Sequence, residues 1–137
     1  MRIVISDRRG LPAAARKIVR FSGDKRIIAF YGSMGAGKTT IIRSLCKVLG
    51  AVDITSSPSF TIVNEYRTIS GELLYHIDFY RIKKKEELFD IGIEEYLTGD
   101  RWCFIEWPDL AGEIVPPGAV NVRITTTGGG QRILDIS

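Results

Sequence analysis

A glycine-rich stretch with one lysine and two threonines is the clearest chemical signal in this sequence. Residues 32–40 read GSMGAGKTT and fit the P-loop pattern G-x-x-x-x-G-K-[ST], with Lys38 and Thr39 at its end. Glycines let the backbone approach phosphate oxygens, and the N–H groups of such a loop point into one concavity. Lys38 can reach the β- and γ-phosphates of a nucleotide, and the Thr39 hydroxyl is placed to bind Mg²⁺. The pattern therefore predicts a site for a nucleoside triphosphate with Mg²⁺.

The segments on both sides of this loop supply the context that the motif needs. Residues 26–31 are typical of a buried strand, and residues 40–49 carry apolar side chains at helical spacing before Gly50, a common helix stop. Because strand, loop and helix follow in the required order, a glycine-rich turn without a ligand is the less favoured interpretation.

Two acidic residues end apolar strands and are candidates for chemistry on the bound phosphates. Asp78 closes the strand predicted at residues 73–78, and Glu106 closes the one at residues 101–106. Parallel strands deliver such side chains to one edge of a sheet, where a carboxylate can hold Mg²⁺ or orient an attacking water. Residues 102–105 form the more continuous apolar run, so we expect them beside the strand before the loop. This favours Glu106 for the Mg²⁺ shell and Asp78 for a supporting or water-orienting role, and the alternative for each acid is that it only caps a turn.

Four other side chains have two interpretations each. Arg8, in a polar turn before the first helix, could contact the nucleotide base or could simply be solvated. Thr61 lies in a small-hydroxyl loop that could sense the γ-phosphate or could be an ordinary surface loop. His76, the one histidine, could be a structural strand residue, which we favour, or a general base. Trp107 either packs against its own turn, which we favour, or faces a partner.

Length and composition limit the fold and the location. The 137 residues, of which 45% are hydrophobic and 26% charged, predict one domain over residues 1–137. No apolar run approaches the roughly 20 residues of a membrane span, and Arg2 lies where a signal peptide would be apolar. The two cysteines suggest neither a disulfide nor a zinc site, so we expect a cytoplasmic protein. A net charge of +3 does not argue for nucleic acid or for an acidic partner.

The remaining pattern alternates between strands and helices. Further strands are predicted at residues 1–5, 51–55, 62–68, 120–126 and 132–136, and helices at residues 11–21 and, in two short pieces separated by Gly92, within residues 86–97. Glycine turns make residues 62–78 and 120–136 two hairpins. The predicted fold is an α/β, P-loop NTPase-like three-layer fold whose mixed sheet has a parallel centre and antiparallel flanking strands.

Four motifs, taken in order, resemble those of the bacterial TsaE family. They read GAGKTT at residues 35–40, SPSFTIVNEY at 57–66, HIDFYR at 76–81 and IEWP at 105–108. The first motif is generic, but the other three together are specific, and the resemblance covers nearly the whole chain. Ser59 stands where the family usually has threonine, which keeps the hydroxyl.

The resemblance implies a function. Members of this family are small Mg²⁺-dependent ATPases, slow alone, that support the TsaB and TsaD proteins in making N6-threonylcarbamoyladenosine in tRNA. The resemblance thus implies ATP and Mg²⁺ as cofactors, TsaB and TsaD as partners, at most an indirect contact with tRNA, and no membrane.

The resemblance also implies roles for individual residues. Those that would bind the triphosphate are Gly32, Gly35, Ala36, Gly37, Lys38, Thr39 and Thr40. Thr39 and Glu106 would hold Mg²⁺, and Asp78 would support hydrolysis together with Lys38 and Glu106. Thr61 would belong to a switch-like loop, Trp107 would lie near the nucleotide or the partner surface, and the turn at Gly128 would approach the nucleotide.

Three other functions fit parts of the pattern. A small-molecule or nucleoside kinase would carry a lid with arginines, whereas residues 83–87 read KKKEE. A GTP-dependent switch would carry an N-K-x-D element, which residues 64–66 do not supply. A structural RNA-binding protein with a decayed loop is disfavoured because Lys38, Thr39 and both strand-end acids are present.

Overall fold

One mixed sheet runs through the computed structural model, which describes residues 1–52, 62–84 and 86–137. Within these residues eight strands form the sheet, in the spatial order β1-β8-β7-β2-β6-β5-β4-β3. The strands are β1 (Arg2–Ile5), β2 (Ile27–Tyr31), β3 (Ala51–Val52), β4 (Val63–Thr68), β5 (Leu73–Asp78), β6 (Cys103–Glu106), β7 (Val120–Thr126) and β8 (Arg132–Ile136). Their bounds agree with the predicted strands to within two residues, except that residues 53–55 of the strand predicted at 51–55 lie outside the described residues.

The centre of the sheet is parallel and its flanks are antiparallel, as predicted. The strands β7, β2, β6 and β5 run parallel to one another. Outside them, β8 and β1 continue one flank and β4 and β3 continue the other, all in antiparallel pairs. Both predicted hairpins, β4–β5 and β7–β8, are present, and β6 lies directly beside β2.

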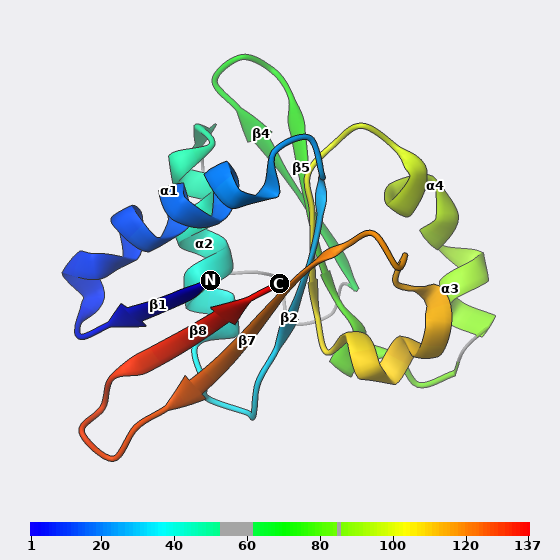
Figure 1. Ribbon diagram of the computed structural model, residues 1–137. Coiled ribbons are helices and arrows are strands. Elements are labelled where there is room, and N and C mark those ends of the chain that lie inside the picture. The colour runs from blue at the N-terminus through cyan, green and yellow to red at the C-terminus, as the bar shows by residue number, and fades with distance from the viewer. Residues whose placement is uncertain (53–61, 85) are drawn as a thin grey trace.

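Helices cover both faces of the sheet and complete three layers (Figure 1). On one face lie α1 (Leu11–Ser22) and α2 (Lys38–Val48), and on the other lie α3 (Glu86–Asp90), α4 (Ile93–Thr98) and the 3-10 helix η3 (Pro108–Ile114). Shorter 3-10 turns are η1 (Arg8–Gly10) and η2 (Phe79–Arg81). The predicted break between the two short helices occurs at Gly92, whose φ is 69°. None of the helices in the described part of the chain is both long and apolar enough for a bilayer crossing.

Each face of the sheet has its own apolar core. Phe104 packs with α1, α2 and Phe30 on one side, while its neighbours Cys103 and Ile105 pack with α3 and α4 on the other. All of β6 is buried, as expected for a central strand. Cys46 and Cys103 are buried and unbridged, and burial raises the pKa of each thiol to about 12, so both act as small apolar side chains.

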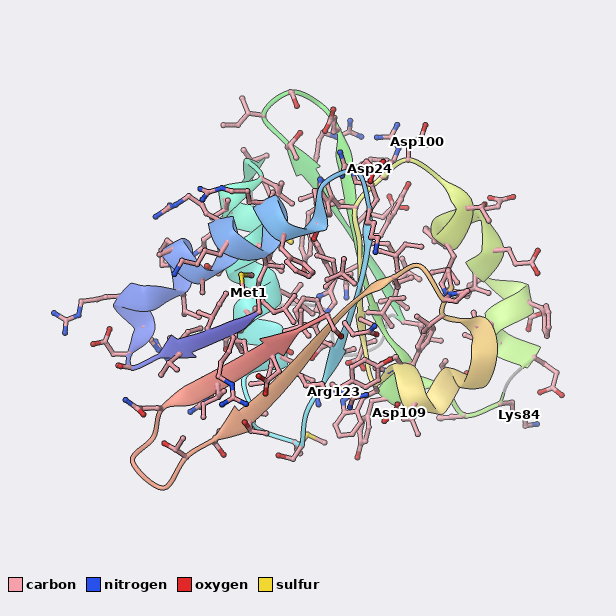
Figure 2. The ribbon with its side chains drawn as sticks, in the orientation of Figure 1. Met1, Asp24, Lys84, Asp100, Asp109 and Arg123 are labelled. Carbon is pink, nitrogen blue, oxygen red and sulfur yellow. The ribbon has the colours of Figure 1, made fainter. Side chains whose placement is uncertain are left out.

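The parallel strands bring the candidate residues to one end of the sheet. Asp24 and Asp100 precede β2 and β6, and they lie at the opposite end of the molecule from Asp109, which follows β6 (Figure 2). In the register of the sheet Glu106 pairs with Phe30 of β2 on one side and with Asp78 of β5 on the other. Both strand-end acids therefore lie at the edge where β2 passes into the glycine loop.

The buried ring of Phe104 provides a test of this central packing. We expect Phe104→Ala to lower the free energy of unfolding by about 3–5 kcal/mol, because the ring is fully buried and its loss leaves a cavity. Phe89→Ala is the matched control, since that ring is 72% exposed and its loss should change stability by less than about 0.5 kcal/mol. Urea unfolding followed by circular dichroism measures both, and similar costs for the two variants would contradict the assigned core.

Candidate functional site

The loop between β2 and α2 has a backbone that requires its glycines. Gly35 and Gly37 have φ angles of 81° and 102°, in the left-handed region that other residues rarely adopt. A Cβ on Gly32 would lie 3.0 Å from the carbonyl oxygen of Ile124 on β7 and 3.2 Å from the Cβ of Ala36. The loop therefore curves tightly around a hollow, here called the cradle. Larger side chains in place of Gly32, Gly35 or Gly37 would strain the backbone or clash with neighbouring atoms.

The ammonium group of Lys38 lies inside this loop. Its Nζ donates hydrogen bonds to the carbonyl oxygens of Gly32 and, at 3.4 Å, Ser33. The Lys38 side chain is almost fully buried, with Nζ 3.5 Å from the centroid of the Trp107 ring, a cation–π contact. The positive charge is thus held at the mouth of the cradle.

Burial and neighbouring carboxylates act on Lys38 in opposite directions. Burial is the larger effect and lowers the pKa of Lys38 from its ordinary value. The carboxylates of Glu106, Asp78 and Asp109 attract the ammonium and partly restore the pKa. A further anion in the cradle would favour the charged lysine in the same way.

Glu106 joins the first turn of α2 to the middle of the sheet. Its Oε1 accepts a hydrogen bond from the Thr39 hydroxyl at 2.8 Å, and its Oε2 is 2.6 Å from Nε2 of His76. Both Glu106 and His76 are buried. The two residues predicted to hold Mg²⁺ are therefore in direct contact, and a histidine from β5 fixes the orientation of the carboxylate.

The surroundings of Glu106 keep it ionised. Burial is the largest single effect and would by itself raise the pKa of Glu106. The hydrogen bond and electrostatic attraction of His76, the hydrogen bond from Thr39 and the charge of Lys38 together outweigh it, so the pKa lies below its ordinary value. At neutral pH the group is a carboxylate, which is the form that binds a hard cation.

Asp78 lies next to Glu106, at the end of the neighbouring strand. Its Oδ1 accepts a hydrogen bond from the backbone N–H of Tyr80 at 3.0 Å and so caps η2. The side chain is half-buried and lines the same cavity as Glu106 and Lys38. The capping bond holds the carboxylate at the edge of the cavity without removing it from the site.

Trp107, directly after Glu106, has an unusual backbone. Its φ and ψ are 56° and 50°, and it is the one residue other than glycine with positive φ in the described part of the chain. Besides its contact with Lys38, its ring lies 5.1 Å from the ring of Tyr80. Strained residues of this kind concentrate at functional sites. The ring therefore packs against neighbouring side chains, the interpretation favoured from the sequence, and it also lines the candidate site.

These groups line one cavity of about 520 Å³. The loop and the first turn of α2 contribute Gly35, Gly37, Thr39 and Thr40 to its wall. Lys38, from the same turn of α2, lines it too, and the ends of β5 and β6 contribute Asp78, Glu106 and Trp107. Ala36 is buried beneath the loop and Gly32 lies against β7, so they shape the cradle from below.

A cavity of similar volume, about 530 Å³, opens beside Arg26, Tyr75 and Trp102. It lies at the amino ends of the parallel strands, whereas ligands of open α/β sheets bind beyond the carboxyl ends. It also lacks the loop and the paired strand-end acids. The cavity beneath the glycine loop is therefore the candidate site.

Arg8 and Gly128 lie outside this cavity. Arg8 lines a smaller adjoining cavity of about 200 Å³, together with Thr40 and Gly130. Gly130, two residues beyond the predicted Gly128, is the turn glycine that reaches it, while Gly128 is exposed. Thr61 lies outside the described residues.

Arg132 belongs to the site, and the sequence did not indicate it. It lines both the main cavity and the adjoining one, and its Nε donates a hydrogen bond of 2.7 Å to the carbonyl oxygen of Ala36. The contact joins residues 96 positions apart, so no local pattern marks it. The contact of His76 with Glu106 is likewise a product of strand register, although the H-x-D motif placed the histidine near Asp78.

The donor set fits Mg²⁺ with a triphosphate better than a metal held by protein alone. Within residues 1–52, 62–84 and 86–137, no three His, Cys, Asp or Glu side chains gather as they would around a protein-bound ion. Mg²⁺ usually takes one or two carboxylates and completes its shell with water and phosphate oxygens. Thr39 and Glu106 match that requirement.

Fold and site together define a class of protein, an α/β chain of P-loop NTPase-like architecture. The family model "Threonylcarbamoyl adenosine biosynthesis protein TsaE" matches residues 5–134. The chain therefore belongs to the TsaE family, which confirms the resemblance seen in the motifs.

Individual relatives agree with this membership. A Haemophilus influenzae protein named "tRNA threonylcarbamoyladenosine biosynthesis protein TsaE" is 36% identical over 111 residues, which are 80% of this chain and 70% of the relative. A Bacillus subtilis protein of the same name is 36% identical over 121 residues, 88% of this chain and 74% of the relative. The crystal structure of Bacillus subtilis YdiB aligns with a TM-score of 0.75 at 27% identity, over 98% of this chain and 82% of that chain.

The lowered pKa of Glu106 predicts an acid-dependent contribution to stability in the metal-free protein. A carboxylate whose pKa is lowered by folding stabilises the fold above its ordinary pKa of 4.5, and the contribution is lost as the pH falls through the lowered value. We expect Glu106→Gln to reduce the free energy of unfolding by about 1–3 kcal/mol at neutral pH and by much less near about pH 3. Urea unfolding at the two pH values measures the difference.

The exposed acid Glu86 supplies the control for this experiment. Glu86→Gln should change stability by less than about 0.5 kcal/mol at either pH. An equal loss for Glu106→Gln at both pH values would show that the ionised carboxylate is not what stabilises the site.

Proposed function

We propose that this protein binds ATP with Mg²⁺, hydrolyses it slowly on its own, and acts with the TsaB and TsaD proteins in N6-threonylcarbamoyladenosine modification of tRNA in the cytoplasm. The observation that carries the proposal is the contact of Thr39 with Glu106 beneath the glycine loop. The hydroxyl and the carboxylate in this contact would share one Mg²⁺. The contact places them next to the cradle that would hold the phosphates. The names of the relatives supply the pathway.

The chain's own groups would supply the contacts for the phosphates. The first N–H groups of α2, at Lys38, Thr39 and Thr40, have no carbonyl partner within the helix and lie where the helix dipole is positive. Lys38 adds a positive charge, and its ammonium donates to loop carbonyls. Phosphate oxygens are stronger acceptors than those carbonyls, so the ammonium would leave the carbonyls and donate to the phosphate oxygens.

The carboxylates have separate roles in hydrolysis. Glu106 and Thr39 would hold Mg²⁺, which would neutralise charge that develops on the phosphates. Asp78, one strand further along, would accept a hydrogen bond from the attacking water and orient it. The adjoining cavity beside Arg8 and Gly130 is the place we propose for the nucleoside end of ATP.

The proposal predicts an ATPase that responds to its partners. We expect phosphate release by the isolated protein to be slow and to rise about tenfold or more when TsaB and TsaD are added, as is common for switch-like P-loop proteins. Lys38→Ala is the control, because loss of the ammonium should abolish ATP binding and hydrolysis with and without the partners. A rate that the partners leave unchanged would contradict the proposed partnership, and undiminished ATP affinity in Lys38→Ala would contradict the site.

The division of labour between the two acids gives a second prediction. Glu106→Ala should raise the Mg²⁺ concentration needed for half-maximal ATP binding by about tenfold, since it removes a direct ligand. Asp78→Ala should leave that concentration within about threefold of the unsubstituted value while it lowers the hydrolysis rate. Titration of Mg²⁺ at fixed ATP, followed by calorimetry and phosphate release, separates the two effects. The reverse order would mean that the two roles are exchanged.

A further inference from the structure

Arg132 reaches from the C-terminal hairpin to the glycine loop. Its Nε donates to the carbonyl oxygen of Ala36 at 2.7 Å, and its Nη1 donates to that of Gly130 at 3.2 Å. The Nε atom would lie 3.3 Å from a Cβ on Gly37, so the guanidinium packs directly on this part of the loop. A side chain from the far flank of the sheet thus holds one peptide group of the loop.

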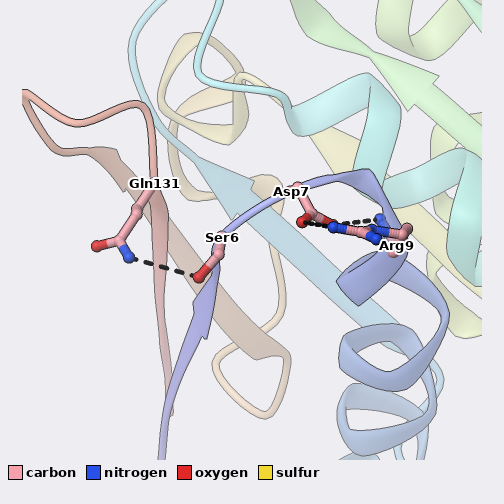
Figure 3. A network of polar contacts seen from close by, with 4 residues as sticks. All are labelled: Ser6, Asp7, Arg9 and Gln131. Carbon is pink, nitrogen blue, oxygen red and sulfur yellow. Dashed lines mark hydrogen bonds and ion pairs between the residues drawn. The ribbon is translucent and has the colours of Figure 1, made fainter.

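The backbone of Arg132 is fixed on both sides. In the register of the sheet it pairs with Ile5 of β1 and with Thr126 of β7. The preceding residue, Gln131, extends its amide toward the hydroxyl of Ser6, which its Nε2 meets at 3.4 Å (Figure 3). The same view shows Asp7 paired with Arg9, so the turn after β1 is tied to itself. The backbone of Arg132 is therefore held in place by the sheet, and the hydrogen bond from its Nε can position the Ala36 carbonyl.

The contacted peptide has two ends that point in opposite directions. The carbonyl of Ala36 and the N–H of Gly37 belong to one planar peptide group, and the described residues contain no cis peptide bond. When Arg132 holds the carbonyl, the N–H of Gly37 faces away from the guanidinium. A phosphate bound on the side of the loop away from the guanidinium would then meet a donor and not a carbonyl oxygen.

This peptide would otherwise turn easily. Gly35 and Gly37 flank Ala36, and glycine restricts the rotation of its adjoining peptides least of all residues. A flipped peptide would present the negative end of its dipole to the phosphates and would replace an attraction by a repulsion. The loop therefore gains from an external contact that selects one orientation.

We infer that Arg132 is a positioning residue for triphosphate binding, which acts by holding the Ala36–Gly37 peptide with its N–H directed into the loop. The inference rests on the proposed function, since it concerns how the same loop binds ATP. It assigns to the C-terminal hairpin a role in forming the phosphate cradle. The rival role for an arginine at this place is a direct contact between its charge and a phosphate.

Three substitutions separate the two roles. Arg132→Gln keeps an N–H donor as many bonds from the backbone as Nε, but it removes the charge. Arg132→Lys keeps the charge but has a methylene group at that place, and Arg132→Met has neither. We expect calorimetry with ATP and Mg²⁺ to give an affinity within about threefold of the unsubstituted protein for Arg132→Gln, and about tenfold weaker for Arg132→Lys and Arg132→Met.

A second readout follows the peptide itself. In the nucleotide-free protein the amide ¹H–¹⁵N resonance of Gly37 should shift in Arg132→Lys and Arg132→Met and stay in place in Arg132→Gln. Arg2→Gln is the control, because Arg2 is an exposed arginine of the same flank that pairs with Asp135 and should affect neither readout. The melting temperature of each variant shows whether it is folded.

The outcomes distinguish the inference from the proposed function. Retained affinity in Arg132→Lys with loss in Arg132→Gln would overturn the inference in favour of a direct charge contact. The inference would also be overturned if all three variants kept the ATP affinity of the unsubstituted protein, or if all three lost ATP affinity to the same extent. If the unsubstituted protein does not bind ATP, the proposed function fails, while the Gly37 resonance still decides whether Arg132 holds the peptide.

Discussion

The hydrogen bond between Thr39 and Glu106 depends on nearly every feature of this fold. It forms because β2 and β6 are adjacent and parallel, so that one strand leads into the loop while the other ends in the acid. His76 reaches the same carboxylate because β5 pairs with β6 in a register that sets Asp78 opposite Glu106. A shift of either strand by one residue would turn these side chains to the other face and would separate the site.

The site contains a backbone conformation that is costly in free energy, at Trp107. A left-handed residue such as Trp107 costs about 1–2 kcal/mol, which its surroundings must offset. Its ring contacts the Lys38 ammonium and the Tyr80 ring, and η3, which begins at the next residue, fixes the turn. The strained turn therefore aims an aromatic face at the charge in the loop, and a relaxed turn would lose that contact.

Local pattern predicted the elements and the segments that line the cavity, but not the contacts across the fold. Residues 32–40, Asp78 and Glu106 were predicted because glycines, a lysine and strand-end acids at fixed spacing have a chemical meaning within a short segment. The mixed sheet followed from strand lengths and hairpin turns. Arg132 could not be predicted, because its partner lies 96 residues away and its register with β1 and β7 has no local signature. The contact of His76 with Glu106 likewise needed the register of β5 and β6.

The charges in the cavity bear on why the proposed ligand would be bound with a metal ion. Lys38 and Arg132 are the positive side chains that line the cavity, together with two carboxylates, Asp78 and Glu106. A triphosphate adds several negative charges to this wall, and at a partly buried site each like-charge pair is costly. A divalent cation between Glu106 and the phosphates would turn that repulsion into attraction, because both would be its ligands. The same acids that disfavour a bare triphosphate would therefore favour its Mg²⁺ complex, and the site would select the metal-bound form without a dedicated protein cage.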